Sequence, residues 1–135
     1  MVEYLFKTAQ EAGVSNFGKF NNYGYRGLYN GETAKDIADR KGISEKEDIL
    51  DYMSSTELAA NLFRITQTDE VLKNKNINNE DDACITHHNV GQAVRQTIKR
   101  IGGTMPEDLP TPSKSAKQIE KEKQKALKTA SKKQK

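Results

Sequence analysis

The chain has 135 residues, of which 34% are hydrophobic and 30% charged, and it contains no tryptophan. This length and polarity fit one small domain with little stability to spare and disfavour several independent cores. Residues 113–135 hold nine lysines and two glutamates, which gives this segment a charge of +7. Because the net charge of the chain is +3, residues 1–112 carry a charge of −4. A body with that charge repels phosphate as a whole, which argues against a generally basic DNA-binding domain.

The first predicted elements are a helix and a loop. Apolar residues at helical spacing predict a helix over residues 2–12, which ends at Gly13. In residues 16–31, four glycines alternate with five aromatic residues, a composition that disfavours a regular helix. We therefore expect residues 16–31 to form an aromatic, glycine-rich loop.

Two short helices are predicted next. Thr33 is a typical N-cap, and Gly42 ends the helix that it opens. Ser44 and Glu47 form a capping-box pair, which predicts a second short helix through Met53. Together, the two short helices faintly resemble a helix-turn-helix, but phosphates would repel the acidic side chains of the second helix.

Two longer helices form the predicted core. Ser54 and Glu57 make another capping-box pair. The stripe that follows predicts the main core helix, with Leu58, Ala59, Leu62, Phe63, Ile65 and Leu72 as its apolar residues. After a polar break at residues 74–79, apolar residues over 90–101 predict a second long helix, which ends at Gly102.

The end of the chain is expected to lie outside the core. All three prolines lie in residues 105–112, which predicts an extended or turning segment. Ser115 and Gln118 could cap a last, Lys-rich helix, but so polar a segment nucleates poorly. The overall prediction is an all-α domain over residues 1–112, followed by a flexible basic tail over residues 113–135 that is partly helical or disordered.

Catalytic, metal and targeting motifs are not recognisable. His87 and His88 follow Asp81, Asp82 and Cys84, but neighbouring helical side chains point about 100° apart and no second pair completes a zinc site. No nucleophile motif or phosphate-binding loop is present. We expect no cofactor, no metal and no enzymatic activity. The lone cysteine, the missing signal sequence and the missing apolar span predict a cytoplasmic protein without membrane contact.

Aromatic and basic residues are candidates for nucleic-acid binding. Aromatic rings next to basic side chains can stack on bases and hold phosphates of single-stranded DNA, with the basic tail as a further contact. The candidate residues are Phe17, Lys19, Tyr25, Lys99 and Arg100. The alternative, which we favour, is that the aromatic residues fill a helical core and that the basic residues are solvated near a helix C-terminus.

Three segments together resemble a known family. They are GYRGLYNG at 24–31, STELAANLFRITQTDEVLK at 55–73 and VGQAVRQTIKRIGGTMPEDLPTP at 90–112. In this order they resemble the C-terminal half of bacterial DNA-damage-inducible protein D. The resemblance implies a bacterial or phage-encoded protein of the DNA-damage (SOS) response, without assigned catalytic activity, that acts on the RecA recombinase filament on single-stranded DNA. It also implies an N-terminal Bro-type domain, which lies outside this sequence and is a further candidate partner.

The resulting expectation is a regulatory module that contacts another protein in DNA-damage metabolism, with RecA as the implied partner. The residues expected to make this contact are Arg26, Tyr29, Arg64 and Arg95. One alternative is a direct nucleic-acid-binding protein or antirepressor-like accessory factor. Another is a structural half that docks onto a separate Bro-type domain.

Overall fold

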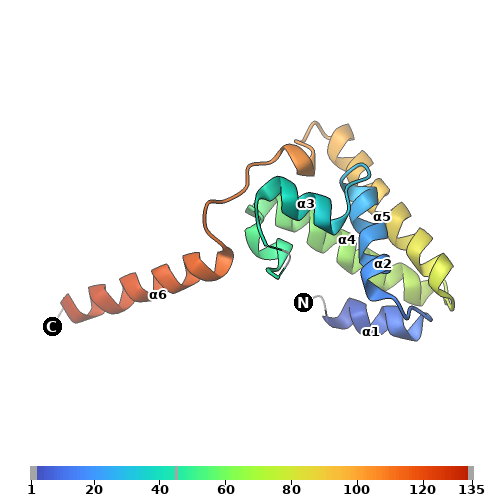
Figure 1. Cartoon of the computed structure of the whole chain (residues 1–135), viewed down its shortest axis with the longest axis horizontal. Helices are drawn as coiled ribbons and strands as arrows, with labels where there is room; N and C mark the ends of the chain where they lie inside the picture. The colour runs from blue at the N-terminus through green and yellow to red at the C-terminus, as the bar shows by residue number, and fades with distance from the viewer. Residues whose placement is uncertain (1–2, 45, 134–135) are drawn as a thin grey trace.

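The computed structural model describes residues 3–44 and 46–133, and over these residues it is all-α, as predicted (Figure 1). It contains no strand in this part of the chain. The α-helices are α1 (Glu3–Glu11), α2 (Phe17–Leu28), α3 (Ala34–Lys41), α4 (Ser55–Asn74), α5 (Glu80–Arg100) and α6 (Ala116–Lys133). Two short 3₁₀ helices, η1 (Ile49–Tyr52) and η2 (Pro106–Asp108), lie in the connections.

Residues 17–28 form helix α2, so the prediction of a loop over residues 16–31 is wrong. A Cβ atom at Gly24 would lie 2.2 Å from the His87 ring, and one at Gly27 would lie 2.2 Å from the His88 carbonyl oxygen. These glycines therefore allow α2 to pack directly against α5. A glycine costs a helix about 1 kcal/mol, a local penalty that the tertiary packing of the two helices outweighs here.

Helices α2 and α5 lie side by side and run in the same direction (Figure 1). At one end Glu80 accepts hydrogen bonds from the backbone of Ser15 and Asn16. At the other end Arg95 donates to the carbonyl of Leu28. Helix α5 begins at Glu80, ten residues before the predicted start, because Asn79 caps it and three acidic residues occupy its first turn.

Local capping signals account for several other helix ends. Thr33 and Asp36 form a reciprocal capping box at the start of α3, and Gly42 ends that helix with a φ of +70°. Gly13, with a φ of +94°, follows α1 as predicted, while Val2 lies outside the described residues. Among the described residues of the segment from Ser44 to Met53, only η1 is helical, so the predicted second short helix, which would read DNA in a helix-turn-helix, is not formed by those residues.

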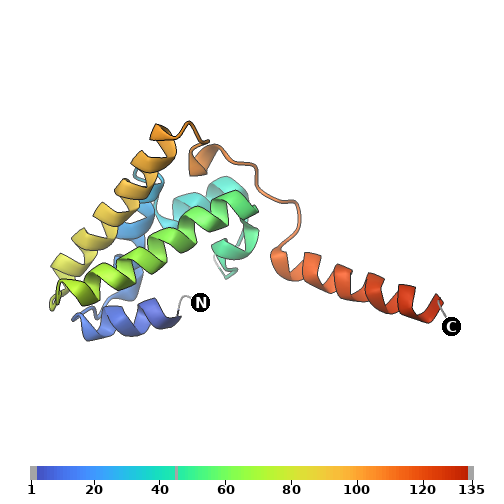
Figure 2. The same ribbon diagram turned by 180° about the vertical axis from the view of Figure 1, so that it is seen from behind.

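Helices α4 and α5 meet at the turn of residues 75–79 and diverge from it like the arms of a V (Figure 2). The closed end packs against α1 and the start of α2 around Leu5, Phe20 and Leu72. Nearer the open end, a second cluster forms around Leu28, Ile37 and Val94. The molecule therefore has two adjoining clusters in its core and leaves the open end of the V to be lined by surface residues.

Helix α6 extends away from this body (Figure 1). The backbone N–H of Ser115 donates to Gln118 Oε1, and the N–H of Gln118 donates to Ser115 Oγ, which confirms the predicted cap. Near this end, the Lys117 N–H also donates to Asp51, a residue of η1. The predicted flexibility of residues 113–135 stays a prediction.

Candidate functional site

Most of the buried residues of α4 are polar. The side chains of Glu57, Asn61, Arg64 and Thr68 are all at most 1% exposed. These residues follow one another at the three- and four-residue intervals that a core stripe normally shows with apolar residues. Of the residues predicted for the apolar stripe, Ile65 and Leu72 are buried, and Leu58 and Leu62 are half-buried. The prediction is wrong for Ala59 and Phe63, which are exposed. Ser54 precedes the helix but makes no side-chain cap bond.

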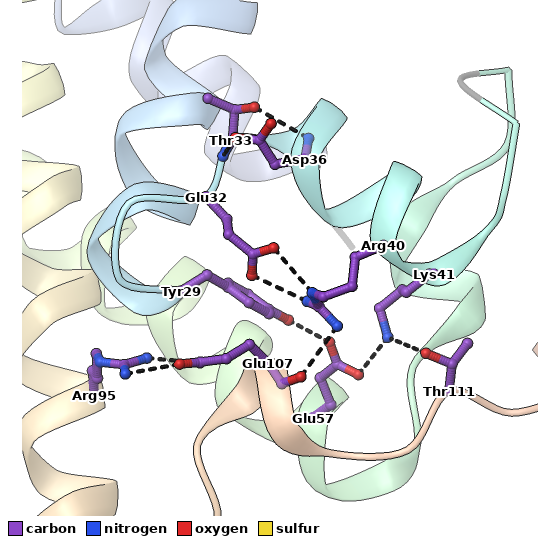
Figure 3. Close-up of polar contacts among 10 residues, drawn as sticks. All are labelled: Tyr29, Glu32, Thr33, Asp36, Arg40, Lys41, Glu57, Arg95, Glu107 and Thr111. Atoms are coloured by element: carbon purple, nitrogen blue, oxygen red, sulfur yellow. Dashed lines mark hydrogen bonds and ion pairs between the residues drawn. The ribbon is translucent and has the colours of Figure 1, made fainter.

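Glu57 is the centre of one half of this polar core (Figure 3). It accepts a hydrogen bond from Tyr29 Oη at 2.5 Å and one from Lys41 Nζ at 2.7 Å. Asn61 Nδ2 donates to the same phenol oxygen at 2.9 Å. Burial and the neighbouring carboxylate raise the pKa of Tyr29, so the phenol stays protonated and continues to donate. Tyr29 is thus a core residue whose hydroxyl is held by both Glu57 and Asn61.

Arg64 is the centre of the other half. Its guanidinium lies 2.6 Å from His87 Nε2, donates to Asn61 Oδ1 at 3.1 Å and stacks over the Tyr25 ring at 4.6 Å. On the far side of the imidazole, Nδ1 lies 2.9 Å from the Phe20 carbonyl oxygen. Burial, and then the adjacent guanidinium, lower the pKa of His87 well below its ordinary value.

The four residues predicted to contact a partner do not form one surface. Tyr29 and Arg64 are buried, so they cannot meet another protein while the domain is folded. Arg95 forms a bidentate ion pair with Glu107, in which Nη1 and Nη2 donate to the two carboxylate oxygens at 2.7 and 2.8 Å (Figure 3). Only Arg26 is exposed. The physical reason is the polar core, in which Tyr29 and Arg64 find hydrogen-bond partners and so become buried.

Residues 103–112 form a strap that crosses the open end of the V. Glu107 is its main anchor: the side chain pairs with Arg95, and the backbone carbonyl accepts from Arg40 at 3.2 Å (Figure 3). Further along, Thr111 accepts a hydrogen bond from Lys41 at 3.2 Å. Pro106 is buried beneath this arrangement. The strap is therefore fastened to α3 and α5 by charged side chains.

An apolar groove of about 300 Å³ lies between the strap and the two arms of the V. Its wall on α4 is a separate face of the helix, about 120° around the axis from the polar core. The lining residues are Thr56, Ala59, Ala60, Phe63, Val94, Thr97, Ile98, Ile101, Gly103, Thr104, Pro106 and Leu109. Phe63 is 52% exposed and Ile101 76% exposed, so two large apolar side chains stand at the groove without cover. Sequence analysis missed this groove, because Phe63 fits an apolar stripe by its spacing and only the burial of Glu57, Asn61 and Arg64 places it outside.

The residues predicted to bind nucleic acid are separated by the fold. Phe17 packs between Phe6 and Phe20, and Tyr25 is buried, as the core alternative predicts. Lys19 lies 3.6 Å from both Glu80 and Asp81, at the start of α5.

Lys99 and Arg100 are exposed at the other end of the same helix. Nineteen residues of α-helix separate Lys99 from Glu80, a distance of about 28 Å. The five residues therefore make no single binding face.

Within the described residues, no group of three or more His, Cys, Asp or Glu side chains could hold a metal ion. His87 in particular is occupied by Arg64 and the Phe20 carbonyl. Among the same residues, no helix combines the length and apolar composition that crossing a membrane requires.

Comparison with known proteins gives one family and one curated relative. The family model described as the DinD C-terminal domain matches residues 2–119. Over 119 residues, the chain is 55% identical to DNA damage-inducible protein D of Escherichia coli strain K12, a match that covers 86% of this chain and 43% of that protein. The chain thus spans less than half the length of this relative. No solved structure matches the chain.

Proposed function

Because the chain belongs to the family of DinD C-terminal domains, we propose that it is a protein-binding module of the bacterial DNA-damage response. The name of its relative in Escherichia coli associates that protein with DNA damage. The module has no catalytic activity of its own and works in the bacterial cytoplasm. Its partner is the RecA recombinase filament, as the resemblance of the sequence implies.

The observation that carries this proposal is the apolar groove. Fully burying a large apolar side chain contributes about 1.5–3 kcal/mol, so covering Phe63, which is 52% exposed, should contribute about half of that, and Ile101 adds a second contact. Exposed apolar side chains gathered around a concave surface are typical of protein-binding sites. The polar core holds α4 in place without using Phe63, so this side chain is free to contact a partner.

Co-sedimentation of the purified chain with RecA filaments on single-stranded DNA tests the proposal. Phe63→Ser and Ile101→Ser should each weaken binding about tenfold, which corresponds to about 1.4 kcal/mol. Ile85→Ser is the matched control, because Ile85 is also 52% exposed but lies outside the groove. Equal binding by all three variants would exclude the groove, and no binding by the intact chain would exclude RecA as the partner.

A further inference from the structure

Helix α6 carries lysines along one face. With 100° between successive residues, Lys117, Lys121, Lys125 and Lys128 fall within an arc of about 80°. We call these four residues the lysine stripe. The apolar residues of the same helix lie away from this face, and they are Ala116, Ile119, Ala126, Leu127 and Ala130. The lysine stripe spans residues 117–128, whose ends lie about 16 Å apart along the helix axis.

The lysine stripe is not neutralised within the described part of the chain. None of its four lysines takes part in an ion pair there. Glu122, a nearby acidic residue of α6, pairs instead with Lys114 at 2.6 Å. All residues from 116 to 130 are exposed, and the helix extends away from the body (Figure 2). The lysine stripe is therefore an accessible row of positive charge.

We infer that α6 is an arm that binds the phosphate backbone of duplex DNA without reading its sequence. Duplex DNA carries about one negative charge per 1.7 Å of its axis with both strands counted, so a row of about 16 Å runs beside a length of duplex that carries roughly ten phosphates. The body, at −4, repels the same phosphates, which leaves the arm as the point of contact. Lysines attract phosphates as point charges and provide no bidentate contact to bases.

Two other classes of partner fit α6 less well. Proteins that hold single strands stack bases on aromatic rings, and residues 113–135 contain no aromatic residue. An anionic membrane surface requires a substantial apolar face, but only Ile119 and Leu127 are large on that side of α6. The duplex satisfies the charge pattern without using the weak apolar face.

This inference is independent of the groove and of the family. The match to the DinD C-terminal domain ends at residue 119, so most of the lysine stripe lies beyond it. DNA binding by α6 needs no RecA and no residue of the groove. Failure of either proposal would therefore leave the other standing.

Fluorescence anisotropy with a labelled 30-base-pair duplex of random sequence tests the arm. If four phosphates are neutralised, log K should fall with log salt at a slope of about −3.6, or about 150-fold between 50 and 200 mM salt. The full chain with K117Q, K121Q, K125Q and K128Q together should bind at least tenfold more weakly and with a flatter slope. Glutamine forms helices about as well as lysine, so this variant changes the charge and keeps α6.

The matched control removes the same charge from the body. Lys7, Lys35, Lys46 and Lys75 are exposed, and a chain in which all four are Gln should bind the duplex within about twofold of the original, as expected when non-specific affinity depends on local phosphate contacts. Equal weakening by both variants would overturn the proposal in favour of net charge. Tighter binding to a single strand of the same length, or stripe-dependent binding to phosphatidylserine vesicles without duplex binding, would also overturn it.

Discussion

Arg64 Nη1 and His87 Nε2 lie 2.6 Å apart inside the core, and this contact fixes the state of the imidazole. A guanidinium can only donate, so Nε2 accepts and the ring proton is on Nδ1, where it donates to the Phe20 carbonyl. A second proton on His87 would remove the acceptor and bring two cations together. The fold therefore requires a neutral histidine.

Stability should fall as the pH drops below 6.5. In the unfolded chain His87 has an ordinary pKa near 6.5, whereas burial and Arg64 lower the pKa in the folded protein. Below pH 6.5 the unfolded state binds more protons, so the free energy of unfolding decreases by up to about 1.4 kcal/mol per pH unit. Urea unfolding at pH 7.5 and 5.5 measures this loss. His87→Gln removes the titrating ring and should show a much smaller difference; an equal difference would assign the effect to another group.

The glycines at the contact of α2 and α5 should not tolerate a methyl group. A Cβ atom at Gly91 would lie 2.7 Å from the Gly24 carbonyl oxygen, which belongs to a backbone that cannot rotate away. Gly91→Ala should lower the free energy of unfolding by about 1–3 kcal/mol in chemical denaturation, despite the better helix propensity of alanine. Gly18→Ala is the control, since its nearest contact is 3.6 Å away, and it should be neutral or stabilising. A stable Gly91→Ala protein would contradict the close packing.

The buried ion pair of Lys41 and Glu57 should be far more sensitive than an exposed one. Both side chains are fully buried and their charged atoms are 2.7 Å apart. Lys41→Met leaves the Glu57 carboxylate without its cation in the core, at a cost of about 3–5 kcal/mol. Lys73→Met breaks a similar pair with Asp69, but that lysine is largely exposed, so the cost should stay below about 1 kcal/mol. Similar melting temperatures for the two variants would contradict this difference.

Features that depend on neighbouring residues could be predicted from the sequence, whereas features that depend on distant ones could not. Thr33, Gly42 and Ser115 act within one helical turn, and their roles as helix ends are confirmed. Gly24 has the local character of a loop residue, and only its contact with His87, 63 positions away, explains its place in a helix. Glu57 similarly looks like a capping residue until Tyr29 and Lys41 are placed beside it.

The groove could not be predicted for the same reason. Its residues come from α4, from α5 and from the strap, and no short motif connects them. Phe63 in particular fits an apolar stripe by its spacing. Its exposure follows only from the polar residues that occupy the buried face of α4.

Loosening the strap should weaken binding of a partner in the groove without unfolding the domain. Glu107 lies between Pro106 and Leu109, both of which line the groove, and it is the residue that Arg95 and Arg40 hold. Glu107→Ala should remove the bidentate ion pair with Arg95, while α4 and α5 keep their core contacts. We expect amide hydrogen exchange to become about tenfold faster over residues 104–112, which corresponds to about 1.4 kcal/mol of local stability.

Asp108→Ala is the matched control, because it removes the same charge from the next residue, which is exposed and takes part in no ion pair among the described residues. Exchange in the strap should then stay close to that of the original protein. Binding of the filament should fall with Glu107→Ala and persist with Asp108→Ala, since a displaced strap removes one wall of the groove. Faster exchange with unchanged binding would show that the partner uses α4 and α5 alone, and unchanged exchange would show that Arg95 does not hold the strap.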